Sequence, residues 1–159
     1  MTIKVYGAEP LDVPLIRGFI WKLAEYEKLE HEVKASEGDI ARLLFGATPR
    51  AFCEIARIDG APVGFAFWFY SVSTFEGRAG IHLEDLYVTP QARGKGAGKA
   101  LLAHLAQRCQ RENLARLEWA VLDWNAPSIA FYDSLGAATL DDWTTRRLTG
   151  EALLKLAQG

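Results

Sequence analysis

The sequence has few of the features that mark secreted, metal-binding or membrane proteins. Only two of its 159 residues are cysteines, Cys53 and Cys109, and neither has other metal-binding residues around it at ligand spacing. No apolar run approaches the roughly 20 residues needed to cross a bilayer, and the N-terminal segment lacks the apolar core of a signal peptide. We therefore expect buried thiols, no bound metal, no membrane association and a cytoplasmic location.

The sequence also lacks an excess of charge of either sign. It has 18 Lys and Arg against 20 Asp and Glu, a formal net charge of −2, so it has no global basic field of the kind that favours nucleic acid. No repeat, linker or low-complexity segment interrupts the chain, and half of its residues are hydrophobic. We expect a single domain over residues 1–159 that buries a sizeable core and does not bind nucleic acid.

The segment from Ile81 to His104 predicts a strand, a glycine-rich loop and a helix in direct succession. Ile81 to Val88 is rich in β-forming residues, Pro90 ends that strand, and a helical pattern begins at Lys99. A helix N-terminus leaves backbone N–H groups unpaired, and glycines let a ligand approach them closely. Arg93, Lys95 and Lys99 add positive charge, so the segment predicts a site for a diphosphate group.

The spacing of the glycines excludes two common nucleotide-binding loops. In a Walker A loop, Arg93 would stand where the first glycine belongs and Ala100 where Ser or Thr must bind magnesium. The dinucleotide motif Gly-x-Gly-x-x-Gly also fails, because its last position falls on Lys99 or on Leu101. A glycine-rich surface connection between strand and helix is the remaining alternative.

The pattern Arg-x-x-Gly-x-Gly at Arg93, Gly96 and Gly98 resembles the acetyl-CoA loop of the GNAT N-acetyltransferase superfamily. Further motifs resemble its spermidine/spermine (diamine) and thialysine acetyltransferase branch over nearly the whole chain. They are Leu23–Glu27, Leu83-Glu84-Asp85, the nine residues Trp124–Tyr132, and the tail Leu153–Ala157. The segment from Ala137 to Arg147 is shorter than in the diamine enzymes, which leaves the identity of the acceptor open.

The resemblance implies an α/β fold of the α+β type. A GNAT-like, mostly antiparallel twisted sheet would be flanked by helices and would bind acetyl-CoA at its central strand and glycine loop. The protein would be a homodimer without a metal. The implied cofactor contacts are Leu86, Tyr87 and Val88 on the strand, Arg93, Gly94, Lys95, Gly96, Ala97, Gly98 and Lys99 in the loop, and Asn125 and Ser128 at a later helix start.

The resemblance also assigns two catalytic residues. Tyr132 would be the general acid, and its phenol, with a reference pKa of about 10 against about 8.5 for a thiol, is suited to protonate a departing thiolate. Read from the residues alone, Tyr132 can equally be a packed side chain in an apolar helix. Glu84 would bind the cationic amine and relay its proton. An acid within a β-rich segment is unusual, because an unpaired carboxylate is costly to bury.

Substrate contacts are implied for Tyr26, Glu27, Glu84 and Asp85. Glu27 and Glu84, with Asp85 if it faces the same side, would form an acidic pocket for a cation with more than one ammonium group. Without the resemblance, Tyr26 and Glu27 would be assigned to the solvated end of a helix. Asp85 normally faces the opposite side of the sheet from Glu84, as a solvent-facing or backbone-bonded acid, unless a β-bulge changes the alternation.

Local patterns predict the remaining elements. Helices are expected behind an Asp12 cap to about Tyr26, behind a Ser36 cap to about Phe45, from Lys99 to about Glu112, from Ile129 to Leu135 behind an Asn125 cap, and from Gly150 to Ala157. Strands are expected at Ile3–Tyr6, Phe52–Ile58, Val63–Tyr70, Leu117–Leu122 and Trp143–Leu148, with a loop over Ser71–Gly80.

We therefore expect an acetyl-CoA-dependent N-acetyltransferase that acts directly on a primary amine of a polyamine, a diamine or a lysine- or thialysine-like acceptor. Two alternatives stay open at this point. One is a protein or peptide N-acetyltransferase of the same superfamily, and the other is a CoA-binding regulator without catalysis. A Ser/His/Asp hydrolase is not supported, because the chain has no Gly-x-Ser-x-Gly motif.

Overall fold

A five-stranded sheet organises the larger of two compact units, Met1–Ala120, in the computed structural model, which describes residues 1–159. The strands lie in sequence order, each antiparallel to the next except for the parallel pair β4 and β5. They are β1 (Ile3–Gly7), β2 (Phe52–Ile58), β3 (Ala61–Ser73), β4 (Arg78–Val88) and β5 (Leu117–Glu118). The predicted mixed, mostly antiparallel sheet is confirmed.

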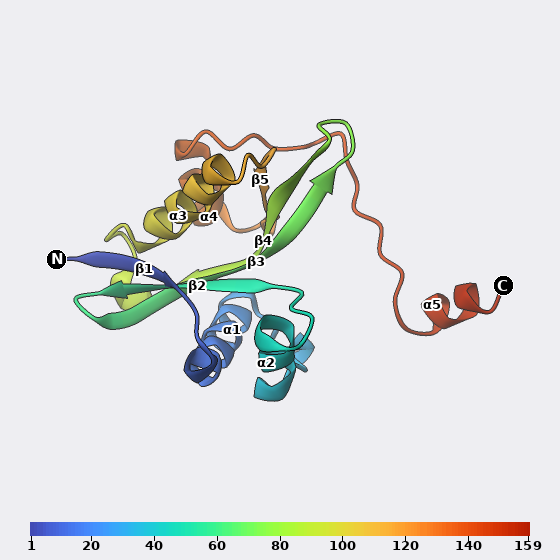
Figure 1. The fold of residues 1–159 in the computed structure, drawn as a ribbon, viewed down its shortest axis with the longest axis horizontal. Coiled ribbons are helices and arrows are strands. Elements are labelled where there is room, and N and C mark those ends of the chain that lie inside the picture. The colour runs from blue at the N-terminus through green and yellow to red at the C-terminus, as the bar shows by residue number, and fades with distance from the viewer. The chain divides into compact units, whose positions relative to one another are not determined.

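Helices flank the two faces of this sheet. Figure 1 shows α1 (Val13–Glu27) and α2 (Glu37–Phe45) on one face and α3 (Ala97–Arg111) on the other. Short 3-10 turns at Pro10–Asp12, Glu30–Glu32 and Pro90–Ala92 connect the elements. Ser36 caps α2 as predicted, because its hydroxyl accepts the Asp39 N–H at 3.1 Å.

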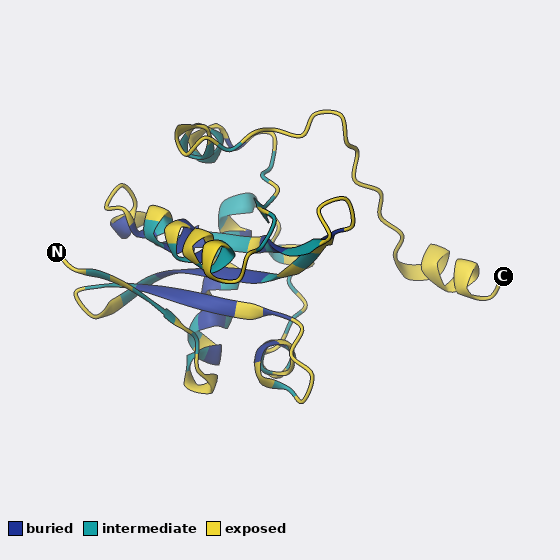
Figure 2. Ribbon diagram, turned by 45° about the horizontal axis from the view of Figure 1, so that its top comes forward, coloured by how far each residue is buried: buried dark blue, intermediate teal, exposed yellow.

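The core is divided between the two faces, and the strands between them are the most buried part of the unit (Figure 2). On the face of α1 and α2, the Phe19 ring stacks on Phe65 with centroids 5.6 Å apart. On the face of α3, the fully buried Leu101 and Leu105 cover the strands beside Trp68. Alternation along the strands therefore supplies an apolar layer to each helical layer.

The smaller unit, Val121–Gly159, contains α4 (Ala126–Ser134) and α5 (Gly150–Ala157). The strand predicted at Trp143–Leu148 is wrong, since this segment has no regular secondary structure. The segment has β propensity, but a strand needs a ladder of backbone hydrogen bonds, and no strand of the sheet pairs with Trp143–Leu148.

Other boundaries differ from the prediction for equally local reasons. The loop expected at Ser71–Gly80 is shorter, because β3 and β4 continue to pair as far as Ser73 and Arg78. The strand expected at Leu117–Leu122 ends at Glu118, where its pairing with β4 stops. The helix expected from Lys99 begins at Ala97, and the helix expected from Ile129 begins at Ala126.

Three single-residue expectations can also be compared with the structure. Cys53 is buried as expected, but Cys109 is only partly buried. Asp12 does not cap α1 with its side chain; its carboxylate instead accepts the Glu9 N–H at 2.8 Å.

None of the helices is long and apolar enough to span a bilayer. No cluster of His, Cys, Asp and Glu side chains is arranged to hold a metal ion.

Candidate functional site

A β-bulge in β4 sets the geometry of the predicted acidic pocket. Phe67 pairs with Asp85 and the next residue, Trp68, pairs with Leu83, so Glu84 is left without a partner on β3. Phe67 belongs to the core under α1 and α2, whereas the Arg108 guanidinium of α3 lies over the Trp68 ring. The extra residue therefore turns Asp85 toward the face of α1 and α2, away from the face that Leu83 occupies.

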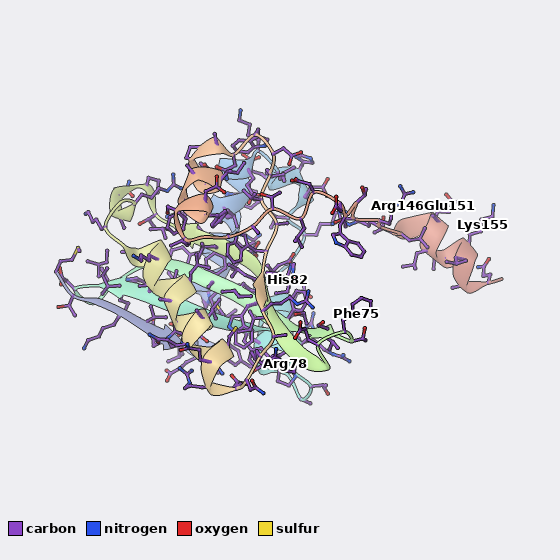
Figure 3. The ribbon with its side chains drawn as sticks, turned by 90° about the horizontal axis from the view of Figure 1, so that it is seen from above. Phe75, Arg78, His82, Arg146, Glu151 and Lys155 are labelled. Atoms are coloured by element: carbon purple, nitrogen blue, oxygen red, sulfur yellow. The ribbon has the colours of Figure 1, made fainter.

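Glu84 lies close to His82, the residue two positions before it on β4. The Glu84 Oε2 and His82 Nε2 atoms are 3.8 Å apart, and the His82 ring packs against Phe69 with centroids 4.9 Å apart. Figure 3 labels His82 on β4. The sequence signal for this pair is that Glu84 follows His82 by two positions, because residues i and i+2 share one face of a strand.

The carboxylates of this region affect one another electrostatically. The pKa of Asp85 is raised to about 7, first by burial and then by the negative charges of Glu84 and Glu27. Burial also raises the pKa of Glu27, which is the last residue of α1. The structure thus brings together three of the predicted acceptor contacts from two elements, and their shared charge favours a cation.

The glycine loop between β4 and α3 has the backbone geometry that an anion site requires. Gly94 and Gly96 have φ angles of 74° and 94°, which side-chain-bearing residues rarely adopt. Gly96 is the N-cap of α3 and no side chain caps that helix, so the first N–H groups of α3 remain available to a ligand. Lys95 and Lys99 are exposed beside them. These features fit the diphosphate of acetyl-CoA.

The edge of β4 beyond His82 is not paired with another strand, because β5 pairs only with Ile81 and His82. The predicted cofactor contacts Leu86, Tyr87 and Val88 lie on this part of β4. An extended chain can bind to such an edge through backbone hydrogen bonds. The geometry is compatible with the predicted role of these three residues.

Arg93 is oriented toward α1. Its Nε donates to the Val88 carbonyl oxygen at 3.0 Å, and its guanidinium lies 4.9 Å from the centroid of the Tyr26 ring and 5.8 Å from that of Tyr87. Burial raises the pKa of Tyr87, and the Arg93 charge opposes that shift. Arg93 thus links the glycine loop to Tyr26, a predicted acceptor contact.

The second unit holds the remaining predicted residues on α4. Asn125 is buried and caps this helix, because its Oδ1 accepts the Ser128 N–H at 3.4 Å and Pro127 lies in the first turn. Tyr132 is partly buried in the same helix, with its ring centroid 5.5 Å from that of Phe131. The predicted cap is therefore confirmed, while the catalytic and cofactor roles on α4 stay predictions.

Comparisons with known proteins identify the family. The model of the Acetyltransferase (GNAT) family matches residues 17–137. The chain is 37% identical to the thialysine N-epsilon-acetyltransferase of Bos taurus, over 98% of this chain and 97% of that protein. It is 29% identical to the L-ornithine N5-acetyltransferase NATA1 of Arabidopsis thaliana, over 96% and 87% of the two chains.

A solved structure agrees with these sequence matches. The integron cassette protein VCH_CASS6 of V. cholerae superposes with a TM-score of 0.82, at 27% identity, over 100% of this chain and 99% of the other. The predicted superfamily is confirmed, and the thialysine acetyltransferase relative confirms the predicted branch. The chain belongs to the GNAT acetyltransferase family and is an N-acetyltransferase.

Proposed function

We propose that this enzyme transfers the acetyl group of acetyl-CoA directly to a primary amine of a small acceptor that carries a second cationic group. The observation that carries the proposal is the bulge of β4, which turns Asp85 toward the face of α1, where the charges of Glu84 and Glu27 act on it. A polyamine, a diamine or a lysine- or thialysine-like amino acid has this chemistry. The names of the thialysine and ornithine acetyltransferase relatives support the same class.

The reaction requires that the acceptor lose a proton before it attacks. We assign this proton to Glu84, the residue at the bulge, directly or through a water. The neutral nitrogen then attacks the thioester carbonyl and loses a second proton to solvent as the amide forms. The carbon–sulfur bond breaks, the leaving thiolate takes a proton from the Tyr132 phenol, and Tyr132 regains a proton from solvent. The Glu27 and Asp85 carboxylates hold the second cationic group, and Tyr26 lies beside Glu27 as a further acceptor contact.

Acetyl-CoA supplies the thioester in this reaction. The proposed diphosphate contacts are the loop from Gly94 to Lys99, and the proposed contacts with the pantetheine arm are Leu86, Tyr87 and Val88. The resemblance also assigns Arg93 to the cofactor, but its guanidinium stacks on Tyr26 and Tyr87, so we propose no phosphate contact for that side chain. Asn125 and Ser128 are proposed to contact the same cofactor. A homodimer and a cytoplasmic location remain predictions that rest on the resemblance and on the sequence.

Thiol release from acetyl-CoA tests the proposal against a panel of amines. The panel contains spermidine, spermine, putrescine, lysine, thialysine, ornithine and a basic peptide, with butylamine as a control that has one amine and the same carbon chain as putrescine. We expect at least one small acceptor with two cationic groups to be acetylated well above butylamine and the peptide. Preferred acetylation of the peptide would overturn the proposed acceptor class.

Tight binding of acetyl-CoA without acetylation of any amine in the panel is a different outcome. It would contradict the proposed reaction and would favour a CoA-binding regulator. Isothermal titration calorimetry with acetyl-CoA, run alongside the panel, separates this outcome from a protein that does not bind the cofactor.

A further inference from the structure

Arg93 occupies a position between two aromatic rings from different elements. Its guanidinium lies over Tyr26, in the last turn of α1, and over Tyr87, near the end of β4. Its Nε donates to the Val88 carbonyl oxygen, which fixes the side chain along the end of the strand. A planar guanidinium is well suited to such stacking, whereas a lysine ammonium is not.

The two lysines of the loop are placed differently from Arg93. All three residues are exposed, but Lys95 and Lys99 lie at the start of α3, beside the uncapped N–H groups of the helix. The charge next to the proposed diphosphate site therefore comes from these lysines and from the helix itself. Arg93, in contrast, contacts the element that carries the predicted acceptor residues.

The buried residues of α1 end at Ala24, before Tyr26 and Glu27. The helix is anchored near its middle by Phe19, whose ring lies 5.6 Å from Phe65 and 5.9 Å from Tyr87. The helix ends at Glu27, and the next residue, Lys28, has a φ of 60° and is exposed. Tyr26, whose ring contacts Arg93, therefore belongs to the same last turn as Glu27.

We propose that Arg93 is a positioning residue that joins the cofactor loop to the acceptor-binding end of α1, rather than a ligand of the cofactor phosphates. This inference deepens the proposed function and rests on it. The stacked guanidinium holds the last turn of α1, and with it Glu27, at a fixed distance from the acids of β4. Loss of the stack weakens acceptor binding and leaves the diphosphate site intact.

Four variants in a double-mutant cycle test this role. Arg93→Met and Tyr26→Leu each remove the cation–π pair, and the double variant removes both partners. We expect each single variant to raise the KM for the acceptor amine by about 3- to 30-fold, and the double variant to be little worse than either single variant. Tyr26→Phe keeps the ring and should retain most of the acceptor binding.

The dissociation constant of acetyl-CoA distinguishes the two possible roles of Arg93. We expect Arg93→Met to leave the dissociation constant of acetyl-CoA within about twofold of wild type. The matched control Lys95→Met should weaken the binding of acetyl-CoA and leave the KM for the amine unchanged. If Arg93→Met behaves like Lys95→Met, with weaker cofactor binding and an unchanged KM for the amine, the positioning role is overturned.

Failure of the proposed function is measured separately, because wild-type acetylation of the amine is determined first. If the wild-type enzyme acetylates no small amine, the proposed function fails, and the same cycle is read from the urea unfolding of the four proteins. A coupling free energy of zero between Arg93 and Tyr26 in that experiment would overturn the inference. A clear coupling would support the link between the loop and α1 independently of the acceptor.

Discussion

Asp85 and Leu83 stand two residues apart on β4, yet they pair with residues on opposite faces of the sheet, Phe67 and Trp68. Regular alternation would place both on the same face. The unpaired Glu84 between them accounts for the difference and brings a second acid beside Asp85. The cost of this arrangement is two neighbouring carboxylates near a third, which only a cationic ligand or a proton relieves.

Asp85→Asn should change how the stability of the protein depends on pH. Burial and the neighbouring charges raise the pKa of Asp85 to about 7 in the folded protein, against an ordinary value of 3.8. Between these values the folded state binds more protons than the unfolded chain, so wild-type stability falls as pH rises from about 4 to about 7. Asparagine mimics the neutral acid, and the variant should become more stable than wild type at pH 8, by about 4 kcal/mol as an upper limit.

Urea unfolding of both proteins at pH 5, 6, 7 and 8 measures this difference. The gain of Asp85→Asn over wild type should be smallest at pH 5, increase up to about pH 7 and level off by pH 8. Glu84→Gln provides a second comparison, because removal of the Glu84 charge lowers the pKa of Asp85 and should reduce the pH dependence. A gain that is the same at every pH would contradict the raised pKa.

Glu84→Gln should also slow the acetylation of small amines. A general base typically contributes about 10²- to 10⁴-fold to the rate, and glutamine has nearly the same shape but accepts no proton. We expect kcat to fall by about that factor near neutral pH and to recover in part at higher pH, where more of the free amine is already neutral. Steady-state kinetics from pH 7 to pH 10 measures both effects.

Two carboxylate variants serve as controls for Glu84→Gln. Glu27→Gln should raise the KM for the amine with a smaller effect on kcat, because it removes a binding charge. Glu76→Gln, on the hairpin between β3 and β4, removes an exposed acid that contacts Arg78 and should change neither constant. If Glu84→Gln and Glu76→Gln have the same kcat, Glu84 is not the base.

The sequence was sufficient where the interaction is local. Ser36 and Asn125 cap α2 and α4 as predicted, because a capping side chain bonds to a backbone N–H only three residues away. The glycine loop was predicted for the same reason. Trp143–Leu148 shows the limit of such reasoning, because β propensity alone does not supply the strand with which the segment would pair.

Long-range relationships could not be predicted from the sequence. The bulge at Glu84 depends on the register between β3 and β4, and a register shift leaves no mark on either strand alone. The stacking of Arg93 on Tyr26 joins residues far apart in the chain, and no periodicity relates them. The resemblance to motifs of the family points to Tyr26 and Glu84, but only the fold shows what each contacts.

Tyr132→Phe tests the proposed general acid on α4. The variant keeps the ring that packs beside Phe131 and removes only the hydroxyl. We expect kcat to fall by about 10- to 10³-fold while the dissociation constant of acetyl-CoA stays near that of wild type. Pre-steady-state thiol release and calorimetry measure the two quantities. Equal loss of rate and of cofactor binding, or no loss of rate, would contradict the assignment.

Glu54 provides the last prediction, because it is a carboxylate buried under α3. Only 3% of its surface is exposed, and its oxygens lie 3.5 Å from His104 Nε2 and 3.6 Å from Arg108 Nη2. Arg108→Met removes one partner and leaves a buried charge poorly compensated, so it should cost about 3–5 kcal/mol of the free energy of unfolding. Glu54→Gln in the same chain should restore part of this loss.

The comparison that decides this prediction is Arg116→Met. Arg116 pairs with Glu118 at 3.2 Å, but both side chains are more than a third exposed, and such surface pairs contribute about 1 kcal/mol or less. Urea unfolding should therefore separate the two variants by several kcal/mol. Water solvates the exposed Glu118 carboxylate when its partner is removed, but it does not solvate the buried Glu54 carboxylate. Equal losses in the two variants would mean that water reaches Glu54 and that the cluster with His104 and Arg108 does not stabilise the packing of α3.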